Sequence, residues 1–80
     1  MTLPKVVLYS RPGCHLCDEA REVVLAERCT TPFELEEIDI ETDDALLLDY
    51  GMRIPVVTIG GDEAFEYTVD ARAFAELVRG

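Results

Sequence analysis

The sequence predicts a single α/β domain with the element order β-α-β-α-β-β-α and a four-stranded mixed sheet flanked by helices. Two observations support this fold class. Two strand-like segments are each followed by a helical pattern, and a Gly-Gly turn then joins two further strands before a last helix. At 80 residues, 49% of them apolar, the chain is long enough for one packed domain, residues 1–80.

The first half of the chain predicts a strand, a helix and a second strand. Lys5–Tyr9, which contains the apolar run Val6–Tyr9, indicates a buried strand, and Ser10-Arg11-Pro12-Gly13 indicates a turn after it. From Cys14 to about Arg28 the pattern is helical, and Thr30-Thr31-Pro32 stops it. Alternating apolar residues predict the second strand from Phe33 to Asp39. The apolar stripe of the helix consists of Leu16, Ala20, Val23 and Val24.

A short second helix follows the second strand. We expect Thr42 to be its N-cap, because a side-chain hydroxyl satisfies free N–H groups at a helix start. Asp43 and Asp44 in the first turn suit the positive end of the helix dipole, and Gly51 is a typical stop.

A hairpin and a third helix complete the chain. Gly60-Gly61 predicts a tight turn between two strands, Pro55–Ile59 and Ala64–Tyr67. Asp70 then caps the last helix. The apolar residues of that helix are Ala71, Phe74, Ala75, Leu77 and Val78.

The chain is strongly acidic, with 17 acidic residues against 7 basic ones and a formal net charge of −10. Affinity for nucleic acids and for anionic membranes comes from Lys and Arg, so this balance argues against both as partners. Two interpretations of the acidic surface remain. It keeps the protein soluble, or it attracts a basic protein partner.

The beginning of the chain and its cysteine content bear on the compartment. The apolar run Val6–Tyr9 is too short for a signal-peptide core or a membrane span, so we expect a cytoplasmic protein. Three cysteines are too few, and odd in number, for a secreted disulfide scaffold. In a reducing compartment a Cys-x-x-Cys pair is catalytic, redox-active or metal-binding.

Cys14-His15-Leu16-Cys17 lies where the first turn passes into the helix. A cysteine at a helix start faces unpaired N–H groups and the positive dipole end, which favour the thiolate. Cys17 is one turn further along the same face and can reach the first sulfur. We therefore predict a thiol–disulfide redox centre. Asp18 and Glu19 raise the cost of a nearby thiolate, so we expect the pKa of Cys14 to be only moderately lowered.

Two segments resemble a known family. Ser10–Cys17 is similar to the active-site segment of glutaredoxins and glutaredoxin-like proteins of the thioredoxin superfamily. Ile54-Pro55-Val56-Val57 resembles the Val-Pro step of that superfamily, where a cis proline faces the cysteines. The matches lie about forty residues apart in the family's order, and the element order agrees along the whole chain. The resemblance implies a thioredoxin-like fold, and a cis Pro55 that leaves the backbone of Ile54 free to pair with substrate.

The predicted activity is that of an enzyme, a dithiol–disulfide oxidoreductase. The Cys14 thiolate attacks a substrate disulfide, and Cys17 resolves the mixed disulfide, leaving a Cys14–Cys17 disulfide for an external reductant. The expected partners are a disulfide-containing protein or small-thiol substrate and a reductase. We expect a monomer with no bound cofactor.

Three basic side chains are candidates for substrate binding. In glutaredoxins a basic residue at the place of Arg11 helps to hold a glutathione carboxylate, and Arg53 could add positive charge on the same face. His15, when protonated, could stabilise the Cys14 thiolate. His15-Leu16 replaces the Pro-Tyr pair of typical glutaredoxins. The alternative interpretation of all three is a solvated surface side chain.

The segment after the hairpin departs from the family pattern. Glutaredoxins that use glutathione carry a Gly-Gly turn followed by an Asp that receives the γ-glutamyl end. This chain has Phe65–Asp70 there, so only Asp70 could take that role, and bulky side chains would crowd a peptide backbone. Glutathione remains one candidate reductant, and this departure argues against it.

Three alternatives to turnover are compatible with a Cys-x-x-Cys pair in such a domain. A zinc site needs four ligands, and Cys29 lies about 18 Å from Cys17 along the helix, so we expect no metal. A glutaredoxin-like module could hold an iron–sulfur cluster between two subunits, each supplying Cys14, or sense redox state without turnover. The domain could also be degenerate and retained for interaction, which the intact Cys14, Cys17 and Pro55 argue against.

Overall fold

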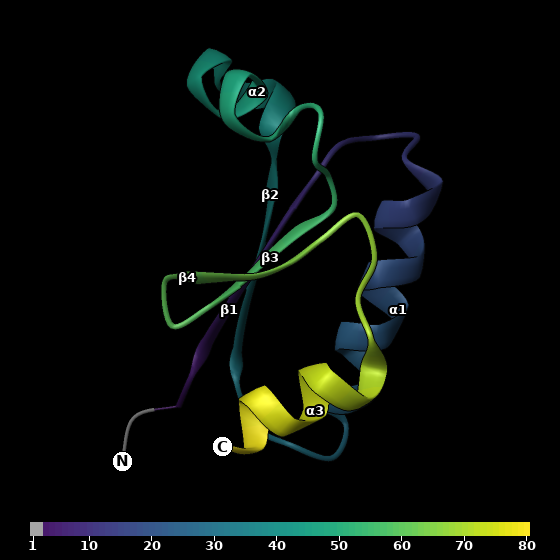
Figure 1. The fold of residues 1–80 in the computed structure, drawn as a ribbon, viewed down its shortest axis with the longest axis vertical. Coiled ribbons are helices and arrows are strands. Elements are labelled where there is room, and N and C mark those ends of the chain that lie inside the picture. The colour runs from purple at the N-terminus through teal and green to yellow at the C-terminus, as the bar shows by residue number, and fades with distance from the viewer. Residues whose placement is uncertain (1–2) are drawn as a thin grey trace.

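The computed structural model describes residues 3–80 and confirms the predicted α/β fold with its four-stranded mixed sheet (Figure 1). No helix among these residues combines the length and apolar composition of a membrane span. The elements are β1 (Lys5–Ser10), α1 (His15–Arg28), β2 (Glu34–Asp39), the 3₁₀ turn η1 (Ile40–Thr42), α2 (Asp44–Tyr50), β3 (Val56–Ile59), β4 (Asp62–Glu66) and α3 (Ala71–Arg79).

The sheet has the strand order β2-β1-β3-β4. β1 pairs with β2 in parallel, whereas the β1–β3 and β3–β4 pairs are antiparallel. Tyr9 on β1 lies opposite Val56 on β3. This register brings Pro55, the residue before β3, to the end of β1 that leads into the cysteine segment.

The hydrophobic core lies between the sheet and two helices. Figure 1 shows α1 and α3 together on one side of the sheet. Phe33 and Phe74 meet edge to face in this core, with ring centroids 5.6 Å apart. Burying an aliphatic or aromatic side chain of this size contributes about 1.5–3 kcal/mol. The buried members are Val6, Leu8, Ala20, Val24, Phe33, Val57, Phe74 and Val78.

The opposite side of the sheet has no helix of the described residues running along it. α2 is short and lies at one end of the sheet (Figure 1). It meets the sheet where Tyr50 stacks on Tyr9, with ring centroids 4.3 Å apart. The helices therefore flank the sheet unequally.

The apolar stripes of the helices differ from the prediction at two leucines. Leu16 is 40% exposed and Leu77 is 52% exposed. In α1 the residues that face the core are Cys17, Ala20 and Val24, which follow the spacing i, i+3, i+7. Leu16 precedes Cys17 by one residue and so points about 100° away from that stripe.

The prediction that Thr42 caps α2 is wrong, because Asp43 is the N-cap. The Asp43 carboxylate accepts the N–H of Ala45 at 2.8 Å. The Thr42 hydroxyl instead donates to the carbonyl of Asp39 at 2.7 Å, inside η1. The chain makes one 3₁₀ turn before α2, which moves the cap by one residue.

The hairpin forms at the predicted glycines, but β4 begins and ends earlier than predicted. Gly60 and Gly61 have φ values of 62° and 91°, which glycine adopts without steric cost. A two-residue turn lets pairing resume at once, so β4 starts at Asp62 rather than Ala64. Tyr67, with φ of 69°, lies beyond the strand. β3 starts at Val56 because Pro55 has no N–H to give to the sheet.

Candidate functional site

The cysteine segment lies on a turn that glycine permits. Gly13 has φ of 79°, and the N–H of Cys14 donates to the carbonyl of Arg11 at 3.4 Å. Cys14 is the N-cap of α1, and its sulfur accepts the N–H of Cys17 at 3.2 Å. A sulfur held this way at the positive end of a helix is in the environment that favours a thiolate.

Cys14 and Cys17 form a disulfide, with Cα atoms 5.2 Å apart. Their exposure differs: Cys17 is fully buried, whereas Cys14 is partly exposed. An incoming disulfide can therefore reach the sulfur of Cys14 and not that of Cys17. This asymmetry fits the predicted roles of nucleophile and resolver.

The loop before β3 has the backbone geometry that the resemblance implied. The Ile54–Pro55 peptide bond is cis. Within residues 3–80, Ile54 takes part in no backbone hydrogen bond, so its N–H and carbonyl have no backbone partner in the chain. The N–H of Tyr67 bonds to the carbonyls of both Arg53 and Pro55, at 3.2 and 2.9 Å, and holds the loop from either side of Ile54.

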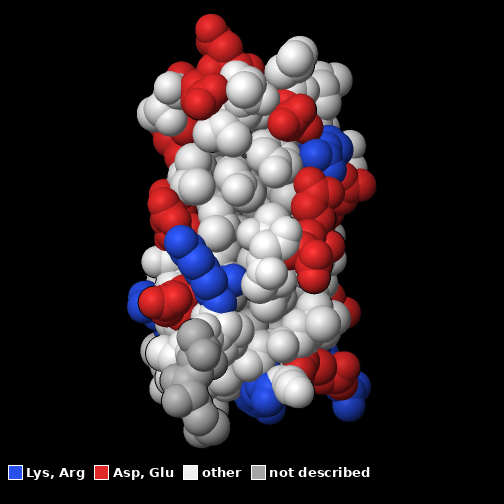
Figure 2. Space-filling view, turned by 90° about the vertical axis from the view of Figure 1, so that its left-hand side faces the viewer, with Lys and Arg blue, Asp and Glu red and all other residues white. Residues whose placement is uncertain are grey.

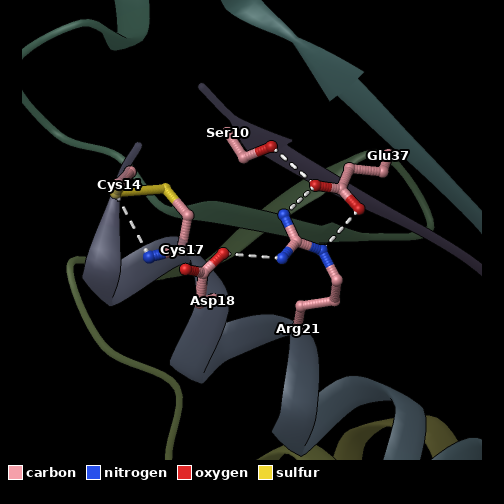
Figure 3. Close-up of polar contacts among 6 residues, drawn as sticks. All are labelled: Ser10, Cys14, Cys17, Asp18, Arg21 and Glu37. Atoms are coloured by element: carbon pink, nitrogen blue, oxygen red, sulfur yellow. Dashed lines mark hydrogen bonds and ion pairs between the residues drawn. A yellow bond between two sulfur atoms is a disulfide. The ribbon is translucent and has the colours of Figure 1, made fainter. Parts of the chain in front are cut away.

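An ion-pair cluster beside the disulfide was not predicted from the sequence (Figure 3). The Arg21 guanidinium on α1 donates from Nε to Glu37 Oε1 at 2.8 Å, and from Nη2 to Glu37 Oε2. Its Nη1 donates to Asp18 Oδ1 at 2.8 Å. The buried hydroxyl of Ser10 also donates to Glu37 Oε2 at 2.8 Å. We call Ser10, Asp18, Arg21 and Glu37 the Arg21 clamp.

The clamp ties the first turns of α1 to the ends of β1 and β2. The Arg21 guanidinium, helped by the Ser10 hydroxyl, lowers the pKa of Glu37 although desolvation opposes this. Hydrogen bonds to Glu37 and Asp18 raise the pKa of Arg21. One signal in the sequence could have indicated the unusual position of Glu37. At strand spacing Glu37 shares a face with Leu35, so it is a carboxylate on the apolar face of the predicted strand, and the structure pairs it with the core residue Leu8.

Arg11 lines an open groove next to the cysteine segment. Its guanidinium donates to Glu41 Oε2 at 2.9 Å and is half-exposed. The groove has a volume of about 420 Å³. Its lining residues are Ser10, Arg11, Pro12, Gly13, Asp18, Arg21, Glu37 and Asp39.

The other predicted binding residues have partners within the chain. His15 is 87% exposed, and its Nε2 lies 3.8 Å from Glu19 Oε1. Arg53 donates to Glu63 at 3.1 Å and to Glu66 at 3.2 Å, beyond the hairpin. Asp70 caps α3 as predicted, accepting the N–H groups of Arg72 and Ala73 at 2.9 and 3.4 Å. A substrate role for these side chains, and for Arg11 and Ile54, stays a prediction.

The third cysteine lies far from the disulfide, at the other end of α1. Cys29 is exposed at the C-cap of α1, and its thiol lies 3.5 Å from the carbonyl of Leu25. Among residues 3–80 no group of three or more His, Cys, Asp or Glu side chains is arranged to hold a metal ion.

Comparison with known proteins agrees with this geometry. The family model described as "Glutaredoxin-like domain (DUF836)" matches residues 5–78. A thioredoxin of Methanocaldococcus jannaschii is 28% identical over 82 residues, covering 99% of this chain and 96% of that protein.

Two solved structures are similar in both fold and sequence. The solution structure of protein Ne2328 from Nitrosomonas europaea has a TM-score of 0.82 and 30% identity, covering 98% of this chain and 94% of that one. The X-ray structure of the X. campestris protein XcR50 has a TM-score of 0.73 and 32% identity, covering 92% of this chain and 95% of that one.

Proposed function

This chain belongs to the glutaredoxin-like domain family, and we propose that it is a dithiol–disulfide oxidoreductase. One observation carries the proposal: the disulfide at the start of α1 joins a partly exposed sulfur to a fully buried one. In the reduced state the same arrangement offers one thiol for attack and keeps the second one turn away for resolution.

The reaction transfers two electrons from the protein to a disulfide. The Cys14 thiolate attacks one substrate sulfur and forms a mixed disulfide, and the other substrate sulfur leaves as a thiolate that takes up a proton. The Cys17 thiol loses its proton and attacks the Cys14 sulfur. The Cys14–Cys17 disulfide forms, and the second substrate sulfur leaves. A thiol reductant or a reductase then restores both thiols in a reducing cytoplasm.

The substrate docks, in this proposal, along the backbone of Ile54 and in the groove beside Arg11. The free N–H and carbonyl of Ile54 pair with an extended segment around the substrate cysteine. The groove accommodates residues on the other side of that cysteine, with Arg11 at its rim. Such docking suits a disulfide in a protein or peptide. Phe65–Asp70 offers no glycine for close backbone approach, so we propose a reductant other than glutathione.

A mixed-disulfide trap tests the proposal. Cys17→Ser keeps the nucleophile and removes the resolver, so the reduced variant should accumulate mixed disulfides through Cys14 with disulfide-bonded peptides. Mass spectrometry would identify the linked residue. Cys14→Ser is the matched control and should trap nothing, while Cys29→Ser in both backgrounds removes the remaining thiol.

Two results would contradict the proposal. One is the absence of trapping by Cys17→Ser together with no Cys14–Cys17 disulfide in the oxidised wild type. The other is a brown protein with visible absorbance after anaerobic purification, which would favour the iron–sulfur alternative.

A further inference from the structure

The sheet has a second face, which we call the outer face, on the side away from the core. Val6 and Leu8 point into the core, so Val7 and Tyr9 point the other way. The register adds residues from the neighbouring strands to this side. The uncharged residues of the outer face are Val7, Tyr9, Ile38, Val56 and Thr58.

The outer face is apolar and only partly covered. Val7, Tyr9 and Ile38 are half-buried, Val56 and Thr58 are buried, and Tyr50 of α2 stacks on Tyr9 at one end of the face. Sheets made wholly of parallel strands are covered on both faces, whereas a mixed sheet such as this one can leave one face open, and helices cover the β1–β2 pair on one side only. Figure 2 shows this side of the molecule as a strip of uncharged side chains along its length.

Acidic side chains border this strip on the two edge strands. Glu34 and Glu36 on β2 share the side of Val7, and Glu63 and Glu66 on β4 pair with outer-face residues of β3. Acidic side chains are seen along both margins in Figure 2. Lys5 contacts Glu36 at 3.2 Å, and Arg53 bridges the two glutamates of β4. Four carboxylates against two cations leave the face negative.

The dimensions of the strip match one α-helix. Three strand spacings separate the edge strands, about 14 Å in all, and a helix with its side chains is about 10–12 Å wide. The six residues of β1 extend about 20 Å, which equals the length of roughly 13 helical residues.

We propose that the outer face binds an amphipathic helix of a partner protein, with its apolar side on Val7, Tyr9 and Ile38 and lysines or arginines along both flanks. A second copy of the chain would bring the same carboxylates against these, and like charges disfavour that pairing. Nucleic acids and anionic membranes are repelled for the same reason. A helix with basic flanks satisfies both the apolar strip and its acidic margins. The proposal does not depend on the redox activity.

The test uses a synthetic peptide and NMR of the ¹⁵N-labelled protein. The probe is a 14-residue helical peptide with leucines at i, i+3, i+4 and i+7 and lysines on both flanks. We expect shifts concentrated at the amides of β1 and β3, with a dissociation constant of about 0.1 mM or tighter. A matched peptide with glutamates in place of the lysines should not bind.

Two protein variants distinguish an effect of the carboxylates at the outer face from a general effect of the protein's net charge. E34Q/E66Q removes one carboxylate from each margin and should weaken binding at least about fivefold. E22Q/E76Q removes two exposed carboxylates from α1 and α3 and should change binding less than about twofold.

Several outcomes would overturn the proposal. They include no binding of the lysine peptide, equal binding of the glutamate peptide, shifts outside the outer face, and equal losses in the two variants. Self-association of the free protein through the same amides would also overturn it, because it would assign the face to a second copy.

Discussion

The two ends of α1 surround cysteine sulfur in opposite ways. At the start, Cys14 accepts an N–H from Cys17 and lies at the positive end of the helix. At the other end, the sulfur of Cys29 lies 3.5 Å from the carbonyl of Leu25. Cys29 is the more exposed of the two, so accessibility alone would make it the more reactive thiol.

Position on the helix, rather than exposure, therefore distinguishes the two sulfurs chemically. N–H groups stabilise the sulfur anion that attacks a disulfide, whereas carbonyl groups offer such an anion no stabilisation. The start of α1 is also held by the Arg21 clamp, which joins it to two strands. The following predictions test this contrast, beginning with the largest effect.

Replacing Cys14, the proposed nucleophile, should have the largest effect. Cys14→Ser should lower the rate of dithiol-dependent disulfide reduction by about 10³-fold or more, because no other thiol is placed to attack. Cys29→Ser should leave the rate unchanged. A steady-state assay with a peptide disulfide measures both. An equal loss in the two variants would show that Cys29 is needed as much as Cys14 and would contradict the contrast between the two ends of the helix.

Alkylation should rank the thiols of the reduced protein. With limiting iodoacetamide at pH 7, we expect Cys14 to react about tenfold faster than Cys29, because the helix start favours its thiolate. Cys17 should be protected by burial. Peptide mass spectrometry over a time course gives the three rates. Faster modification of Cys29 would show that exposure outweighs helix position.

Loosening the clamp should weaken the fold and alter its pH dependence. Glu37→Gln should lower the free energy of unfolding by about 1 kcal/mol at pH 7, a modest value because solvent screens these half-exposed groups. Urea titration measures it, with Glu22→Gln as the control.

The pH dependence of this loss follows from the direction of the pKa shift. The pKa of Glu37 is lowered in the folded state, so its contribution is complete above the ordinary value of 4.5 and is lost as pH falls below it. The difference between wild type and Glu37→Gln should therefore shrink at pH 3.5. A difference that is constant with pH would assign the effect to packing.

The smallest predicted effect concerns the charge next to Cys14. Asp18→Asn removes a carboxylate from the first turn of α1, so the Cys14 thiolate should become easier to form. We expect its alkylation rate to rise about two- to threefold. The same substitution should not change the rate at Cys29, at the other end of the helix. Equal acceleration of both cysteines would indicate a change in net charge alone.

Most of the fold could be predicted because local signals agree with the tertiary structure. The Gly60-Gly61 turn, the Asp70 cap and the cysteines at a helix start each act over a few residues, and the structure contains all three. The errors come from competition between neighbours. Thr42 and Asp43 are both good caps, and a 3₁₀ turn decides between them.

The Arg21 clamp was missed because it depends on contacts between distant segments. Arg21 and Glu37 are 16 residues apart and meet only once β2 lies beside β1. The partners of Arg11 and Arg53 are likewise 30 and 10 residues away. A sequence gives the charge of such side chains, but their pairing follows from strand order and register.

The acidic edge strands have a further consequence for behaviour at high concentration. β2 and β4 leave unpaired backbone groups at the two sides of the sheet, where a strand from another molecule could add. Repeated addition of this kind builds insoluble fibrils. Glu34, Glu36, Glu63 and Glu66 place charge on both edges, so the molecules should resist aggregation at neutral pH. Neutralising these side chains, for example by Glu→Gln substitution, should remove this protection, and fibrils should then form first through these edges.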